Sequence, residues 1–355
     1  MTKRVAYCTG FWCTNIGNAF FSMGVEHVLK KILGEENVTL VSDIQTYTDS
    51  VGKRLYPDKN QLNYLSRLDV DFIVLAGPVL SKYFLRLWRD TLIALEERGV
   101  RCILLSAGMM KMTDEAMAEC RAFFSEHPPF ILCTRDKETY EAFGRYALHS
   151  YNGICFSFFV PDCYNPCPLN GNQYIVLNFD KISEPEIIPN APDGFEFNGI
   201  HYGVRSTGAL TKVARKTDRF SDALIYAQSF LPQKTRPDRI GDYSIFRTDH
   251  RFHPHYRGKI YAQANSFCAD LPYGYLNIYA NSSLTLSDRV HACAVTLAYG
   301  HPAMFFSKTN RVGLLERVGA AEISLHPVTL DLEHLNTEKR AMTEWLKTVL
   351  TEAGT

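Results

Sequence analysis

Short apolar runs alternate with segments of helical spacing along most of the chain. The clearest unit spans residues 284–319, where apolar runs at 284–286 and 303–306 flank a stretch of helical spacing at 292–299. Gly300 is placed to end that helix. We predict two neighbouring strands joined by the helix, and a parallel pair because a helical crossover joins parallel strands.

The polar residues between the first run and this helix carry candidate chemistry. Ser287 and Asp288 are residue types that cap helix N-termini, so Arg289 and His291 should lie in the first helical turn. A cation and an imidazole at the carboxyl end of a parallel strand, beside unpaired helix amides, are typical of an anion site. The structural alternative is that Arg289 pairs with Asp288 and His291 is a satisfied turn residue.

The first half of the chain repeats the alternation of strand and helix. Apolar runs predict strands at 3–8, 38–41, 71–76, 100–106 and 131–133, and helical spacing predicts helices after the turn at 15–18, at 83–98 and at 136–146. This rhythm is typical of a parallel, doubly wound sheet. The Pro- and Asn-rich stretch 161–172 is the strongest linker signal, so we predict an α/β protein of two Rossmann-like domains.

Residues 173–261 are less regular. A strand is indicated at 174–177, after which Pro, Gly and aromatic residues follow with no clean period. The segment 246–257 is rich in basic and aromatic residues, which suits either a solvated loop or a ligand-binding one. The rhythm of strand and helix returns from about residue 271, and a last helix is predicted at 337–350.

Composition narrows the setting. Lysine plus arginine and aspartate plus glutamate both number 38, so no net field favours nucleic acid or a membrane surface as a partner. No window of about 18 apolar residues occurs, and we expect an unexported, cytoplasmic protein. The ten cysteines are too dilute for a disulfide scaffold and lack a zinc spacing, so neither a metal nor a cofactor is expected.

Here a resemblance adds to the pattern. Ser-Asp-Arg-Val-His-Ala at 287–292, Tyr-Gly-His-Pro-Ala at 299–303 and then Asn310 resemble the C-terminal signature of the polysaccharide pyruvyl transferase family. The resemblance implies a transferase that moves pyruvate from phosphoenolpyruvate onto sugar hydroxyls of a cell-surface polysaccharide or its precursor, as a ketal. Its partners would be that donor, a sugar or oligosaccharide acceptor, and membrane-bound glycan assembly machinery.

The same resemblance implies a domain plan. The family has two GT-B-like halves facing a central cleft, which here would be residues 1–165 on the acceptor side and 166–336 with the donor site. A terminal helix within 337–355 would pack back on the first domain.

Candidate residues follow from both arguments. Arg289 suits a donor clamp, because its planar fork binds phosphate and carboxylate in bidentate fashion, and His291 suits the general acid that protonates the donor methylene. Ser287 and Asn310 of the same signature are further candidates for substrate binding. On the first-domain side the family's turn and Arg-Asp motifs correspond to Asn15, Asn18, Arg135 and Asp136. Capping of their own helices is the alternative for Asn15, Asn18 and Asp136.

One departure from the family bears on the donor site. The family tends to have an arginine just after the first strand of the second domain, where this chain has Asn-Phe-Asp at 178–180. Arg247 or Arg251, from the basic and aromatic segment, could supply the missing cation.

Two other functions remain open from the sequence. One is a GT-B glycosyltransferase that holds the diphosphate of a nucleotide sugar at Arg289. The other is a catalytically inactive, glycan-binding homologue that has lost the family arginine. A nicotinamide-dependent dehydrogenase is disfavoured, because the first turn lacks the Gly-x-Gly-x-x-Gly fingerprint.

Overall fold

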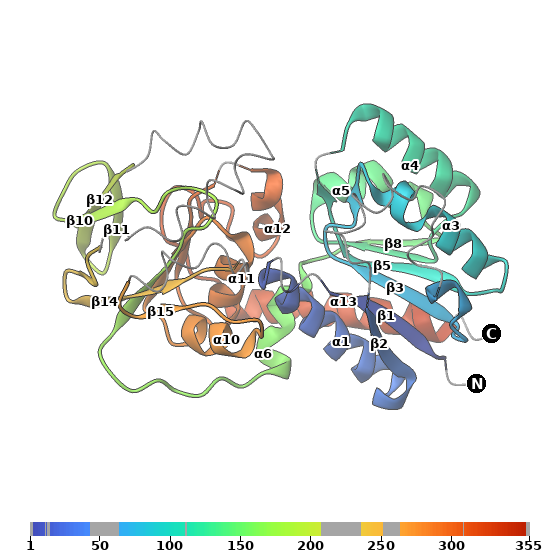
Figure 1. The fold of residues 1–355 in the computed structure, drawn as a ribbon, viewed down its shortest axis with the longest axis horizontal. Coiled ribbons are helices and arrows are strands. Elements are labelled where there is room, and N and C mark those ends of the chain that lie inside the picture. Colours follow the sequence, from blue (N-terminus) through green and yellow to red (C-terminus); the bar gives the residue numbers. More distant parts are fainter. Residues whose placement is uncertain are drawn as a thin grey trace. The chain divides into compact units, whose positions relative to one another are not determined.

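The computed structural model describes residues 3–10, 12, 15–42, 64–110, 112–206, 236–250, 263–307 and 309–352. The chain divides into two compact units (Figure 1). Unit 1 contains Met1–Phe11, Phe21–Cys163 and Glu333–Thr355, and unit 2 contains Trp12–Phe20 and Tyr164–Leu332. The segment Trp12–Phe20 therefore groups with the second unit, which the sequence did not indicate.

The core of unit 1 is a parallel sheet in the order β2-β1-β3-β5-β7-β8. Its strands are β1 Val5–Thr9, β2 Val38–Ser42, β3 Phe72–Ala76, β5 Arg101–Ala107, β7 Ile131–Thr134 and β8 His149–Asn152. A short parallel pair, β4 Leu80–Ser81 and β6 Met109–Met110, lies beside them. The strands predicted in the first half of the chain are thus present, within a residue or two at their ends.

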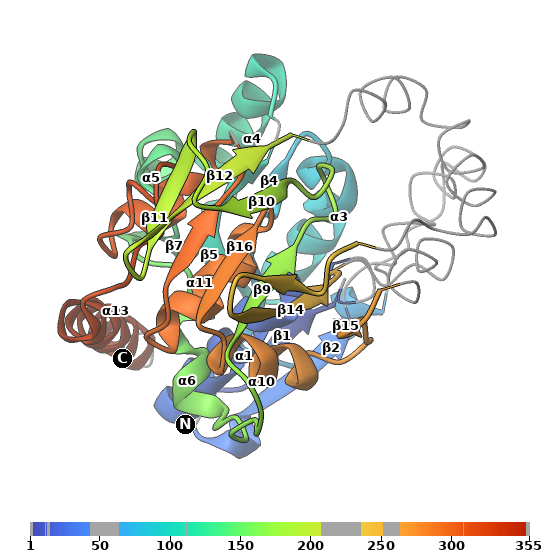
Figure 2. The ribbon, with the colours of Figure 1, turned by 90° about the vertical axis from the view of Figure 1, so that its left-hand side faces the viewer.

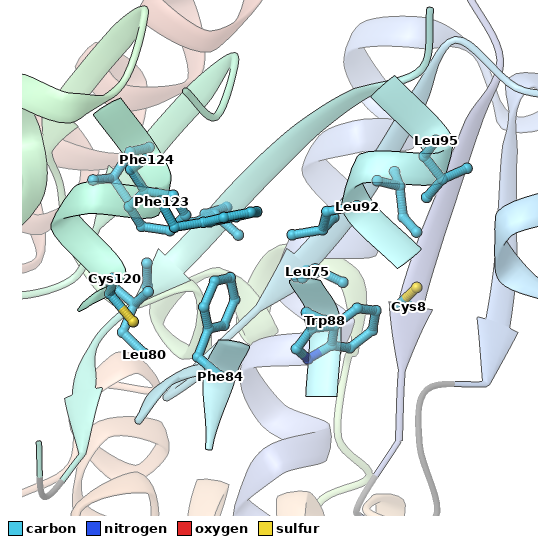
Figure 3. Close-up of a cluster of buried hydrophobic side chains, with 14 of the residues drawn as sticks. Cys8, Leu75, Leu80, Phe84, Trp88, Leu92, Leu95, Cys120, Phe123 and Phe124 are labelled. Atoms are coloured by element: carbon cyan, nitrogen blue, oxygen red, sulfur yellow. The ribbon is translucent and has the colours of Figure 1, made fainter. Parts of the chain in front are cut away.

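The helices of unit 1 bury apolar side chains against this sheet. They are α1 Gly17–Leu33, which belongs to unit 1 from Phe21 onward, α3 Phe84–Glu96, α4 Asp114–Glu126, α5 Lys137–Phe143, α6 Val160–Cys163 and α13 Leu332–Glu352, which belongs to it from Glu333 onward. On one face Trp88 of α3 and Phe124 of α4 pack in a cluster with Leu75 of β3 (Figure 3). Each such fully buried side chain stabilises the fold by about 1.5–3 kcal/mol. The terminal helix α13 starts five residues before the predicted position and stacks Trp345 on Tyr151 of β8 at 4.9 Å between ring centroids.

Unit 2 is organised on a second sheet, in the order β13-β14-β9-β16-β17 (Figure 2). Its strands are β9 Tyr174–Asn178, β13 Arg239–Ile240, β14 Tyr243–Thr248, β15 Ser266–Phe267, β16 Leu284–Ser287 and β17 Ala303–Phe305. The neighbours β14, β9, β16 and β17 run parallel, which confirms the predicted parallel pair of β16 and β17. The accompanying helices are α10 Tyr273–Ala280, α11 Val290–Ala298 and α12 Gly313–Glu316.

A small antiparallel sheet follows β9 and was not foreseen from the sequence. It has the order β10-β12-β11, from Glu186–Pro189, Ile200–Arg205 and Gly194–Phe197. The turn between β11 and β12 is Asn198-Gly199, with φ of 51° and 74°. An Asn-Gly pair with both φ values positive is typical of a two-residue hairpin, so this dipeptide was the available signal.

The predicted linker is attached to unit 2 from Tyr164 onward. Asn277 of α10 accepts a hydrogen bond from the Cys167 amide at 2.8 Å, and Asn281, one turn later, accepts one from the Leu169 amide at 3.2 Å. Tyr299 donates its hydroxyl to the Tyr164 carbonyl at 2.9 Å. Side chains at α10 and at the end of α11 therefore satisfy part of the backbone of the polar linker.

Within the described ranges no helix is long and apolar enough to cross a membrane.

Candidate functional site

Three adjacent parallel strands of unit 2 end at one edge of the sheet, and each is followed by polar residues. His250 follows β14, Asp180 and Lys181 follow β9, and Arg289 follows β16. The chain goes from β9 to β14 on one side and later to β16 on the other, so the strand order reverses at β9 (Figure 2). Ligands of open parallel sheets bind outside the carboxyl ends of strands at such a reversal. This edge is the candidate site.

Arg289 occupies the N-cap position of α11 and is held from one side only. Its Nε is paired with the Asp180 carboxylate, and 7% of its side chain is exposed. Its Nη2 is buried and has no hydrogen-bond partner within the part of the chain that the structure describes. The structural alternative of an Arg289–Asp288 ion pair is therefore wrong, since the partner is Asp180. A buried guanidinium N–H without an acceptor is costly, and an anion at this point would satisfy it.

Ser287 and Asp288, predicted to cap the N-terminus of α11, make other contacts. α11 has no side-chain cap, and the Asp288 Oδ2 instead accepts hydrogen bonds from the amides of Lys181 and Ile182, both at 2.7 Å. Burial, together with the nearby Asp180 carboxylate, raises the pKa of Asp288. These bonds join the loop after β9 to the start of α11.

Ser287 is fully buried and bonded within the fold. Its Oγ accepts from the Arg289 amide at 2.9 Å and donates to the Asn178 Oδ1 at 2.8 Å. Asn178 donates in turn to the Thr248 carbonyl at 2.9 Å. The Ser287 side chain thus positions the backbone of Arg289, which differs from the direct contact with substrate that we expected.

His291 lies in the first turn of α11, as predicted, and is buried. The start of α1 lies against it. A Cβ added to Gly17 would be 3.1 Å from the His291 Cβ and 3.2 Å from its Nδ1. A side chain at this position would require the imidazole or the helix start to shift by a few tenths of an ångström, so the glycine allows the close approach.

The turn before α1 holds two of the predicted acceptor residues. The Asn15 Oδ1 accepts from the Gly17 amide at 3.2 Å, and its Nδ2 donates to the Asn18 Oδ1 at 3.4 Å. The Ile16 amide donates to the His250 carbonyl at 2.8 Å. Asn15 and Asn18 were predicted on the first-domain side, and the structure instead groups them with unit 2, next to His291.

His250 was not singled out from the sequence, yet it connects the parts of the site. Its amide donates to the Asp180 Oδ2 at 3.2 Å, and its Nε2 is hydrogen-bonded to the Tyr279 hydroxyl at 2.6 Å. Its ring is fully buried, and burial lowers its pKa to about 3. The imidazole is therefore neutral at physiological pH, and its Nδ1 has no hydrogen-bond partner in the described residues.

Lys181 is the cation that sequence reasoning missed. Its Nζ donates a long hydrogen bond, 3.4 Å, to the Asp288 carbonyl. Burial, together with the positive charges of Arg289 and Arg311, lowers its pKa to about 8, against the opposing effect of Asp288 and Asp180. Lys181 directly follows the segment 178–180, where the family tends to have an arginine. Lys181 is therefore a nearer source of the missing cation than the basic segment 246–257.

Of the two replacements proposed from the sequence, Arg247 has partners within the fold, while its buried Nη1 has no hydrogen-bond partner among the described residues. Arg247 is 4% exposed and forms a forked pair with Glu184, with Nη2 to Oε1 at 3.0 Å and Nε to Oε2 at 3.1 Å. Its Nη2 also donates to the Pro237 carbonyl at 2.7 Å, so the guanidinium holds two segments of the fold together. Arg251 lies outside the described residues. Asn310 begins a short 3₁₀ helix, Asn310–Val312.

The remaining pair of candidates lies in unit 1, at the carboxyl end of β7. The Asp136 Oδ1 accepts from the Thr139 amide at 2.8 Å, which confirms the capping alternative for this residue. Arg135 is 4% exposed, and its guanidinium packs on Gly108, where an added Cβ would be 2.6 Å from Nε. The residues that the structure describes contain no group of three His, Cys, Asp or Glu side chains that could hold a metal ion.

With this geometry in view, comparison with known families identifies the class. The sequence profile of the polysaccharide pyruvyl transferase family matches residues 15–309, which is most of the chain and includes Lys181, Arg289 and His291. The protein belongs to this family and is a transferase with a role in pyruvyl transfer. A comparison with curated proteins found no match.

Two solved structures are similar to this chain. The S. aureus MnaA–UDP co-structure matches with a TM-score of 0.50 and 10% identity, over 97% of this chain and 88% of the other. A putative UDP-N-acetylglucosamine 2-epimerase from Listeria monocytogenes matches with a TM-score of 0.49 and 12% identity, over 96% and 87% of the two chains. The parallel sheets and the first of these matches show an α/β fold of the GT-B-like, Rossmann type. At such low identity the likeness concerns the fold alone.

Proposed function

We propose that the protein transfers the pyruvyl group of phosphoenolpyruvate to two hydroxyls of a sugar, forming a ketal in a cell-surface polysaccharide or its precursor. The observation that carries the proposal is the buried Arg289 guanidinium, which is held by Asp180 through Nε and has no partner at Nη2 among the described residues. A half-satisfied arginine at the start of α11 suits an oxyanion, because the helix amides and the guanidinium act on the same charge.

The proposed reaction has two steps. Addition of the first sugar hydroxyl across the donor double bond needs a proton on the methylene carbon and a new C–O bond at the neighbouring carbon. In the second step another hydroxyl of the same sugar displaces phosphate from that carbon and its proton leaves with the phosphate. The products are the ketal and inorganic phosphate, and no oxidant or reductant is consumed.

His291 is placed to supply the first proton. It lies two residues after Arg289 on the same helix turn, and its ring is buried against the start of α1. Positioned acid catalysis of this kind contributes roughly 10²–10⁴-fold in rate. The neighbouring Asn15 and Asn18 supply amide groups for an acceptor hydroxyl, whereas Arg135 and Asp136 lie in unit 1, with Asp136 bonded to its own helix.

The competing function is transfer from a nucleotide sugar. Melting curves with phosphoenolpyruvate, inorganic phosphate, a UDP-sugar and UDP separate the two, because only a ligand of the native state raises the melting temperature. We expect a shift with phosphoenolpyruvate that Arg289→Ala abolishes. A shift with the UDP compounds alone would refute the proposed donor, and a phosphoenolpyruvate shift without turnover on any sugar would favour an inactive, glycan-binding protein.

A further inference from the structure

We propose that the Lys181 ammonium binds the donor phosphate together with Arg289, as the second cation of the site. This inference rests on the proposed function. It assigns a binding role to a residue that no motif marks.

The backbone fixes where Lys181 can act. Its amide and that of Ile182 both donate to the Asp288 carboxylate at 2.7 Å, and the Asp180 amide contributes a weaker bond at 3.4 Å. Asp288 directly precedes Arg289, so three consecutive amides tie the β9 loop to the start of α11. The ammonium itself lies 3.4 Å from the Asp288 carbonyl, a contact too long to satisfy three N–H donors.

Lys181 lies among charged groups. The cations Arg289 and Arg311 and the carboxylates of Asp180 and Asp288 act on it. His250, which also interacts with Lys181, is held neutral by burial. Burial makes an ammonium with few acceptors costly. A bound phosphate would supply acceptors and negative charge to the ammonium.

The lowered pKa of Lys181, about 8, gives this role a signature. Below that value the free protein already carries the ammonium that the phosphate needs. Above it, binding must also take up a proton, so the affinity for phosphate falls with rising pH, by up to about tenfold for each further pH unit. An arginine at this position keeps its charge and would remove this fall.

Calorimetric titration with phosphoenolpyruvate, and separately with inorganic phosphate, from about pH 7 to about pH 10 tests the inference. We expect Lys181→Met to weaken binding by roughly 10²-fold at neutral pH, since it leaves the other partner of a buried charged contact unpaired. Lys181→Arg should bind within a fewfold of the wild type at neutral pH and lose the alkaline fall. Lys347→Met, a change at an exposed lysine of α13, is the matched control and should leave both ligands' affinities unchanged.

Three outcomes overturn the inference. One is unchanged affinity in Lys181→Met with a normal melting temperature. Another is an alkaline fall that Lys181→Arg keeps in full, because the titrating group would then be a different one. The third is donor affinity that falls in Arg289→Ala but not in Lys181→Met. This result would still agree with phosphoenolpyruvate as the donor. By contrast, failure of the wild type to bind phosphoenolpyruvate or phosphate would refute the proposed function together with the role of Lys181.

Discussion

The buried imidazole of His250 should make the stability of the protein fall steeply in mild acid. In the native state burial lowers the pKa of His250 to about 3, from a usual value of 6.5. Between these two values the unfolded chain binds a proton at this site and the native protein does not. The contribution is therefore fully present above about pH 6.5 and is lost as the pH falls toward 3, by up to about 1.4 kcal/mol per pH unit.

The magnitude follows from the same linkage. Going from about pH 7 to about pH 5, this single group should lower the free energy of unfolding by about 2 kcal/mol. His250→Gln removes the titration and can keep a hydrogen bond to the Tyr279 hydroxyl. The variant is expected to be less stable than the wild type at neutral pH, because the amide fits the ring's place imperfectly, but to lose about 2 kcal/mol less on acidification.

Urea unfolding of both proteins at a series of pH values measures this difference. His326→Ala is the matched control, because His326 is exposed and its hydrogen bonds to the Pro327 carbonyl and Glu322 raise its pKa. A raised native pKa stabilises the native state at low pH, so this control should not lessen the acid sensitivity. Parallel pH profiles for the wild type and His250→Gln would show that the His250 ring is already protonated or solvated in the native state, and the reasoning about a neutral imidazole in the site would be refuted.

Three further predictions concern single contacts. Arg289→Lys should lower kcat/KM at least tenfold although charge is kept, because an ammonium does not reproduce the planar fork that meets Asp180 through Nε and would meet the phosphate through Nη2. Near-normal steady-state kinetics would contradict the clamp. Gly17→Ala should lower kcat about tenfold with little change in melting temperature, because the new methyl group would displace the His291 imidazole while alanine favours the helix; unchanged kcat would mean that the ring position does not matter. Lys339→Met should lower the stability of unit 1 by about 1–3 kcal/mol, because it removes the 2.6 Å ion pair with Asp162. Thermal unfolding measures this loss, and a change within error would show that the pair contributes nothing.

The secondary structure that follows strong local signals could be predicted from the sequence. The unit β16-α11-β17 was identified because apolar runs of strand length, helical spacing and Gly300 agree within twenty residues or so. The strands that the sequence did not predict, such as β14, lack several local signals that agree with one another. β14 alternates buried and half-buried positions, but its Arg247 reads as a surface residue until Glu184, 63 positions earlier in the chain, neutralises it.

The site shows the same limit. His291 lies in the first helical turn as predicted, whereas Arg289 is the N-cap of α11 and not a residue of its first turn. The sequence predicts Asp288 as a local cap, but its carboxylate binds amides more than a hundred residues away in the sequence. Lys181 was overlooked for the same reason, since its role depends on charges that only the sheet brings together.

The most direct test of pyruvyl transfer is an acceptor assay in heavy water. The purified protein, phosphoenolpyruvate and a panel of sugars are incubated in deuterium oxide, and both phosphate release and the mass of the acceptor are followed. We predict phosphate release that depends on the acceptor, and a ketal whose methyl group carries deuterium, because the proton on the former methylene comes through an acid that exchanges with solvent. His291→Ala should lower this rate by roughly 10²-fold or more while donor binding persists. Transfer of a sugar from a nucleotide donor, or phosphate release with no ketal on any acceptor, would contradict the account.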